Sequence, residues 1–112
     1  MQRTRIKICG LTRPEDVSAA VNAGADALGF VFYEKSPRFV TAGQAAKLMS
    51  AVPPFVTTVG LFVNATVAEV AAVTHIAPVS QLQFHGDETP QQCAGLAAIA
   101  NRPFVRVFRV RP

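Results

Sequence analysis

Three side chains in this sequence could act on a small anionic molecule. Cys9 lies near the end of an apolar run and shortly before an expected helix, where a thiolate is stabilised and can serve as a base or a nucleophile; from its position alone, a small core residue is the favoured alternative. The planar guanidinium of Arg38 fits a carboxylate or a phosphate; otherwise Arg38 is a solvated loop arginine or a partner of Glu34. His85 could be an acid, a base or a substrate donor, or a histidine hydrogen-bonded at a strand end.

The remaining polar and titratable residues narrow the chemistry. Asn64 and Asp87 each follow an apolar run, whereas Cys93 lies on an apolar helical stripe and is predicted to be a core residue. His75 falls at a helix end and is interpreted as structural. The sequence has no G-x-G-x-x-G, no Walker loop and no paired-histidine spacing. We therefore expect no nucleotide or metal site, and a reaction that needs no cofactor.

Five apolar runs must position these side chains. They are predicted to be buried strands of a parallel sheet, and they span residues 5–11, 27–32, 57–63, 81–85 and 104–110. Between them lie four segments that open with the pattern T-x-x-E/Q, in which the threonine and the third residue after it can cap a helix reciprocally. The four threonines are Thr12, Thr41, Thr66 and Thr89.

Helix ends and apolar stripes support the same order of elements. Gly24 suits a left-handed stop, Pro53 and Pro78 end the second and third helices, and residues 101–103 end the fourth. Apolar residues recur at helical spacing in the second and fourth helices. The order β-α-β-α-β-α-β-α-β predicts an α/β protein, either a doubly wound open sheet or the first half of a (β/α)8 barrel. The barrel is favoured because the chain stops after a strand, without a helix to cover it.

Composition excludes several other classes of protein. The 112 residues are 50% hydrophobic and 16% charged, which is unlike a disordered chain, and no apolar stretch is long enough to span a membrane. The formal charge of +4 arises entirely from four arginines after residue 101, so we expect no nucleic-acid partner. Two widely spaced cysteines form no disulfide framework, and we expect a reducing, cytoplasmic location.

An ordered set of motifs along the whole chain resembles the phosphoribosylanthranilate isomerase family. The motifs are K-I-C-G-L-T at residues 7–12, G-A-D-A-L-G-F-V-F at 24–32, S-P-R-F-V at 36–40, V-G-L-F-V-N at 59–64 and L-Q-F-H-G-D-E at 82–88. The resemblance implies a (β/α)8, or TIM, barrel and an Amadori rearrangement. In that reaction a phosphoribosylated anthranilate, an anionic aminoaldose, becomes the corresponding 1-deoxyribulose-5-phosphate aminoketose.

The resemblance also implies roles for three residues. The cysteine of K-I-C-G is the family's general base, so Cys9 takes that role. The arginine of S-P-R-F binds the anthranilate carboxylate, so Arg38 does so here, and His85 lines the same pocket as a substrate contact. The family's general acid and phosphate site come from later strands. No residue of this chain matches them, so we expect the 112-residue chain alone to be inactive.

We therefore expect residues 1–112 to form one partial barrel domain of about four and a half β/α units. Two alternatives stay open. A half-barrel leaves unpaired sheet edges at its first and fifth strands, which could pair with another copy or a partner in a non-catalytic protein. A complete small anion-binding domain of flavodoxin type is the other alternative, and the absent last helix counts against it.

Overall fold

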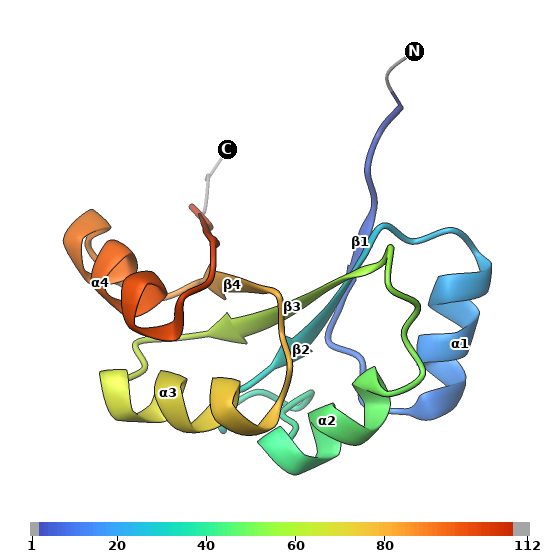
Figure 1. Ribbon diagram of the computed structural model, residues 1–112, viewed down its shortest axis with the longest axis horizontal. Helices are drawn as coiled ribbons and strands as arrows, with labels where there is room; N and C mark the ends of the chain where they lie inside the picture. Colours follow the sequence, from blue (N-terminus) through green and yellow to red (C-terminus); the bar gives the residue numbers. More distant parts are fainter. Residues whose placement is uncertain (1–2, 109–112) are drawn as a thin grey trace.

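A computed structural model describes residues 3–108 and shows alternating strands and helices (Figure 1). The strands form a single parallel sheet, and the helices form an arc around one side of it, from α1 through α2 and α3 to α4. The elements in chain order are β1 (Lys7–Cys9), α1 (Pro14–Asn22), β2 (Ala27–Val31), α2 (Ala42–Met49), β3 (Thr57–Phe62), α3 (Val67–Ile76), β4 (Gln81–Phe84), α4 (Pro90–Ala100) and β5 (Phe104–Arg106).

The strand order is β1-β2-β3-β4-β5, so each strand pairs with its neighbour in the sequence. A doubly wound sheet would reverse direction at a switch point, and this sheet does not. The arrangement is that of the first half of a (β/α)8 barrel, which confirms the predicted fold class. The outer strands are shorter than the apolar runs suggested. β1 has three residues rather than seven, and residues 109 and 110 of the expected fifth strand lie outside the described residues.

Three of the four predicted capping boxes are present. Thr41, Thr66 and Thr89 each accept a hydrogen bond from the backbone three residues on, and the side chain of that third residue accepts one from the threonine N–H. The fourth prediction, at Thr12, is wrong: α1 is preceded by Arg13, whose side chain makes no capping bond. Arg13 is extended because the residue before a proline is pushed out of the helical region, so Pro14 becomes the first helical residue.

Left-handed residues end two helices: Gly24, where this conformation was predicted, and Asn101, where only the end of the helix was predicted. Gly24 has φ +92°, and the N–H groups of Gly24 and Ala25 bond to carbonyls of the last turn of α1, at 3.0 and 3.1 Å. Asn101 closes α4 in the same way with φ +54°. A left-handed residue turns the chain sharply while satisfying the free carbonyls, so each helix returns the chain to the sheet within a few residues.

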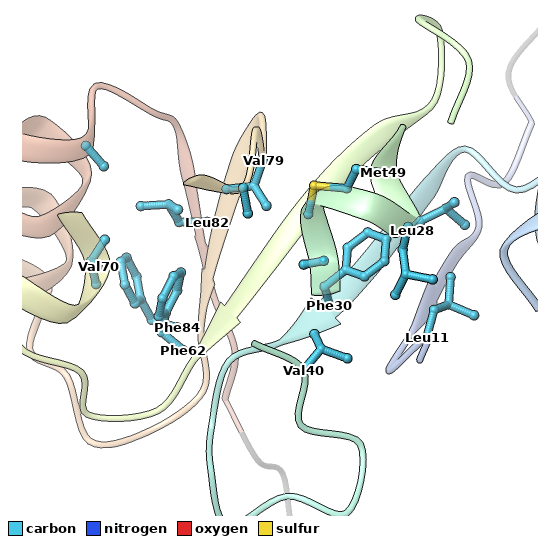
Figure 2. Packing of buried hydrophobic residues seen from close by; sticks show 14 of the residues in the cluster. Leu11, Leu28, Phe30, Val40, Met49, Phe62, Val70, Val79, Leu82 and Phe84 are labelled. Carbon is cyan, nitrogen blue, oxygen red and sulfur yellow. The ribbon is translucent and has the colours of Figure 1, made fainter. Parts of the chain in front are cut away.

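The apolar core fills the layer between the sheet and its helices (Figure 2). Alternate residues of the strands point into this layer, among them Leu28 and Phe30 of β2 and Leu82 and Phe84 of β4, all four completely buried. Helices contribute their predicted stripes, and the Cys93 side chain of α4 is also completely buried, as expected of a core residue. An aromatic row crosses the sheet here, with ring centroids 5.4 to 6.4 Å apart: Phe32, Phe62, Phe84 and Phe104.

The opposite face of the sheet would form the inside of a barrel. Its side chains include Lys7 and Cys9 of β1 and Gln83 of β4, and Lys7 donates a hydrogen bond to the Gln83 amide oxygen. Within residues 3–108, β1 pairs only with β2, and β5 only with β4. No helix among these residues has both the length and the apolarity needed to cross a membrane.

Candidate active site

The Cys9 thiol lies at the carboxyl end of β1, on the barrel-facing side of the sheet. Cys9 pairs with Gly29 of β2, and a Cβ atom at Gly29 would come within 2.9 Å of the Cys9 sulfur. Glycine at this position therefore leaves the space that the thiol occupies. Cys9 is half-buried and forms no disulfide. Its thiol therefore packs against the sheet and remains partly accessible from outside the core.

The Arg38 guanidinium reaches the same strand end from the loop between β2 and α2. Its Nη1 donates a hydrogen bond to the Cys9 carbonyl oxygen at 3.2 Å, and the Arg38 backbone N–H donates to the Ser36 hydroxyl at 3.1 Å. The side chain crosses directly over Gly10, where an added Cβ would lie 2.5 Å from Nη1. Among the described residues Arg38 forms no ion pair with Glu34, and its side chain is exposed.

His85 stands at the carboxyl end of β4, one residue beyond the strand rather than within it as predicted. Its backbone N–H continues the ladder by donating to the Phe62 carbonyl at 3.0 Å. The residue is half-buried and lines a cavity of about 390 Å³ together with Asn64 and Asp87. Neither Cys9 nor Arg38 lines this cavity, so the structure brings Cys9 and Arg38 together and places His85 separately along the same edge.

A buried carboxylate orders the loop that carries His85. Glu88 accepts hydrogen bonds from the backbone N–H groups of Asn64 and Gly86, both at 2.8 Å. Asn64 has a left-handed backbone, with φ +50°, and its side-chain oxygen accepts the Asp87 N–H at 2.8 Å. These bonds lock the loop after β3 to the loop after β4. Asn64 and Asp87 were candidate polar residues in the sequence, but Glu88 was not identified.

The Arg106 side chain, at the end of β5, is a second residue that sequence analysis missed. Its guanidinium donates to the carbonyl oxygens of Phe84, Gly86 and Glu88, at 3.3, 2.6 and 3.2 Å, and to that of Val107. The sequence identified Arg106 only as part of the basic carboxyl-terminal segment. The contacts in the structure show it to be a structural cation that satisfies the carbonyls of the β4–α4 loop.

Two other observations bear on the site's chemistry. Burial, with a smaller contribution from the Glu88 carboxylate, raises the pKa of the Cys93 thiol. That thiol is therefore a poor nucleophile, and Cys9 is the accessible thiol among residues 3–108. Within the same residues, no three histidine, cysteine, aspartate or glutamate side chains are close enough to hold a metal ion.

The fold and the site define a class of protein. Cys9, Arg38, Asn64 and His85 all occur where parallel strands end, at the edge where barrel enzymes bind their ligands. This is the ligand-binding edge of a β/α-barrel protein. A family model described as N-(5'phosphoribosyl)anthranilate (PRA) isomerase matches residues 6–110. The chain belongs to this family.

Curated relatives agree along the whole chain. The N-(5'-phosphoribosyl)anthranilate isomerase of Herminiimonas arsenicoxydans is 59% identical over all 112 residues, which cover 49% of that relative. The enzyme of the same name from Ralstonia nicotianae is 55% identical over the same residues and is also 49% covered. The chain thus spans about half the length of the curated relatives it matches.

Solved structures give the same result for the backbone. Phosphoribosyl anthranilate isomerase from Thermotoga maritima superposes with a TM-score of 0.87 at 36% identity, covering 93% of this chain and 50% of that one. The Thermus thermophilus enzyme superposes with a TM-score of 0.89 at 34% identity, covering 96% and 52%. A further isomerase structure, with a TM-score of 0.87, is in complex with reduced 1-(o-carboxyphenylamino)-1-deoxyribulose 5-phosphate.

Proposed function

We propose that this chain carries the proton-abstracting half of a phosphoribosylanthranilate isomerase. The observation that carries the proposal is the meeting of the Cys9 thiol-bearing strand end and the Arg38 guanidinium, 3.2 Å from the Cys9 carbonyl, in a chain of this family. The reaction is the Amadori rearrangement of N-(5-phosphoribosyl)anthranilate in tryptophan biosynthesis. The free thiols of Cys9 and Cys93 support the accompanying proposal of a cytoplasmic location.

Cys9 is assigned as the general base of this rearrangement. Protonation of the furanose ring oxygen opens the ring and gives a Schiff base between the anthranilate nitrogen and C1 of the sugar. The Cys9 thiolate then takes the proton from C2, and the C2–H electron pair forms the C1–C2 double bond of an enolamine. Tautomerisation of the enolamine yields the 2-ketone. A base at a strand end, supported by Gly29 and half-buried, can be held against one carbon of the substrate.

Arg38 is assigned to the anthranilate carboxylate and His85 to a further substrate contact. The similar isomerase in complex with reduced 1-(o-carboxyphenylamino)-1-deoxyribulose 5-phosphate supports a ligand that has a carboxylate at one end and a phosphate at the other. A guanidinium can hold a carboxylate by two parallel hydrogen bonds. With the carboxylate at Arg38, the anthranilate nitrogen and the adjacent sugar carbons would lie near Cys9.

The general acid and the phosphate site are proposed to be supplied from outside these 112 residues. The test is a chimera that joins this chain to the part of the Herminiimonas arsenicoxydans isomerase that the chain does not cover. We expect the chimera to isomerise freshly prepared N-(5-phosphoribosyl)anthranilate and the 112-residue chain alone to be inactive. A folded but inactive chimera would contradict the proposed function, and turnover by the chain alone would contradict the division of roles.

Self-association of the half-barrel is a second candidate function, supported by the exposure of apolar side chains at both sheet edges. Ile8 of β1 is 39% exposed, and Phe104 and Val105 of β5 are 39% and 44% exposed. Such edges, unpaired among residues 3–108, could add strands from another copy. Sedimentation of the chain at micromolar concentration is the test: a dimer or larger species supports this candidate, and a stable monomer contradicts it.

A further inference from the structure

A hydrogen bond crosses the barrel-facing side of the sheet between two strands that are not neighbours. The Lys7 ammonium, on β1, donates to the side-chain oxygen of Gln83, on β4. β2 and β3 lie between these strands, so the bond can form only because the sheet curves strongly. Gln83 is only 6% exposed, and a buried amide of this kind needs a partner.

The position of this bond relative to the candidate site follows from the alternation of side chains along a strand. Residues two apart point to the same face, so Lys7 lies one layer below Cys9 on β1. The same alternation, extended one residue beyond β4 where the His85 N–H still bonds to Phe62, places His85 one layer above Gln83. The Lys7–Gln83 bond therefore lies directly beneath the two strand ends that carry the proposed base and the proposed substrate contact.

The residues around the bond are compatible with this role. On β2, the residues that pair with Lys7 and Cys9 are Ala27 and Gly29, the smallest side chains available. They leave the lysine stem room to cross toward β4 over the middle of the sheet. A charged donor strengthens the hydrogen bond, and both partners are fixed to hydrogen-bonded strands.

We infer that Lys7 and Gln83 are positioning residues, which set the separation of Cys9 and His85 across the site. The inference rests on the proposed isomerase function, because it assigns the bond a task in that reaction. Neither residue touches the substrate in this account. The bond fixes the curvature of the sheet between β1 and β4, so that the Cys9 thiol and the His85 imidazole are held at a constant separation and face the same bound molecule.

The chimera described above allows a direct test with variants of the two residues. Lys7→Met and Gln83→Met remove the bond while keeping side-chain length, and Lys7→Gln combined with Gln83→Lys restores it with the partners exchanged. Lys47→Met, at an exposed lysine on α2, is the matched control. Each single variant should lower kcat by roughly 10- to 100-fold, the scale of a small misplacement of reacting groups, with KM changed less than about threefold.

The combined variants decide between positioning and a merely structural role. We expect the Lys7→Met/Gln83→Met double variant to lose no more than the worse single variant, because both remove one bond, and the exchanged pair to recover most of kcat. The inference would be overturned if the kcat losses of Lys7→Met and Gln83→Met multiplied in the double variant. It would also be overturned if Lys7→Gln/Gln83→Lys had a kcat no higher than the single variants. Single variants with unchanged kcat would overturn it as well.

A second measurement separates failure of this inference from failure of the proposed function. If the parent chimera is folded but inactive, the proposed function has failed, and hydrogen exchange still tests the bond. Amide exchange at Gly10 and His85, whose N–H groups bond to the neighbouring strands, should quicken several-fold in Gln83→Met and return in the exchanged pair. Unchanged exchange at both amides in Gln83→Met would overturn the positioning role.

Discussion

The Arg38 guanidinium is anchored to the backbone of Cys9, the proposed base: Arg38 Nη1 donates a 3.2 Å hydrogen bond to the Cys9 carbonyl oxygen. This bond uses one of the five N–H donors of the guanidinium. Among residues 3–108 the remaining donors have no hydrogen-bond partner, so they are free for an anion. A ligand carboxylate bound by Arg38 is thereby placed relative to the Cys9 strand end by the backbone itself.

Replacement of the proposed base should affect the chemical step. In the chimera, Cys9→Ala should lower kcat by roughly 100-fold or more, as for the loss of a general base, with little change in KM. Steady-state kinetics measure both constants. Cys93→Ala is the matched control: it should keep kcat but lower the free energy of unfolding by about 1 kcal/mol, since it empties part of the core. A near-normal kcat in Cys9→Ala would remove Cys9 from the role of base.

Replacement of Arg38 should weaken binding of the substrate. Arg38→Met removes a charged hydrogen-bonding group, whose loss costs about 1.5–3 kcal/mol, so KM should rise roughly 10- to 100-fold. Arg38→Lys keeps the charge but loses the planar guanidinium, so its KM should lie between that of the parent chimera and that of Arg38→Met. Arg13→Met, at an exposed arginine that immediately precedes α1, should leave KM unchanged. An unchanged KM in Arg38→Met would show that the carboxylate binds elsewhere.

Gly10→Ala should both displace the Arg38 side chain and strain the backbone at residue 10. Gly10 has φ +83°, which costs a residue with a Cβ about 1–2 kcal/mol, and the new Cβ would lie 2.5 Å from Arg38 Nη1. We expect a loss of stability of at least this size and a raised KM. Gly95→Ala, in the middle of α4 with nothing within 4 Å of the added Cβ, should instead gain up to about 1 kcal/mol. Urea unfolding of the two variants makes the comparison, and equal stabilities would contradict it.

Removal of the Glu88 carboxylate should loosen the loop that carries His85. Glu88→Ala leaves the partly buried N–H groups of Asn64 and Gly86 without their carboxylate acceptor, which should cost about 1–3 kcal/mol of stability in total. Glu88→Gln keeps one acceptor and should lose less. Thermal unfolding and amide exchange at Gly86 measure the effect. Equal losses in the alanine and glutamine variants would show that hydrogen bonding is not the cause.

The ion pair of Arg3 with Asp26 should make stability depend on pH in a narrow acidic range. The hydrogen bond from Arg3, then that from the Ile6 N–H, lower the pKa of Asp26 from 3.8 to about 2. A lowered folded-state pKa contributes stability above the unfolded value, so this contribution is full above about pH 4 and is lost as the pH falls through 2. The difference in unfolding free energy between the parent chimera and Asp26→Asn should therefore shrink from pH 5 to pH 2.

The matched carboxylate for this pH series is Glu34, which is exposed and lies in the loop after β2. Glu34→Gln is carried through the same series as the control, because Glu34 forms no ion pair among residues 3–108. A difference between the parent chimera and Asp26→Asn that stays constant with pH would contradict the assignment. Urea unfolding at each pH supplies the free energies.

The features that were predictable from sequence are those that neighbouring residues decide. The capping boxes at Thr41, Thr66 and Thr89 depend on residues three apart, and the left-handed end of α1 depends on the single residue Gly24. The capping box predicted at Thr12 failed for an equally local reason: Pro14 holds Arg13 in an extended conformation, so the helix begins one residue later than a cap at Thr12 requires.

The residues of the candidate site also fall into those that the sequence identified and those that it did not. Cys9, Arg38 and His85 were identifiable because strand ends can be located from apolar runs and because their motifs resemble a known family. Glu88, Arg106 and the Lys7–Gln83 bond were not, since each depends on at least one partner that lies 18 to 76 residues away in the sequence. Charge and polarity alone gave no sign of which backbone groups these side chains would meet.

The sequential strand order has a consequence for synthesis on the ribosome. Every strand from β2 onward pairs with the strand made just before it, so the partner of each new strand is already present when that strand emerges. The loop that must close for each pairing spans only one helix, which keeps its entropic cost small. A chain with this topology can fold progressively from its amino terminus during translation, unit by unit, rather than waiting for a distant segment to arrive.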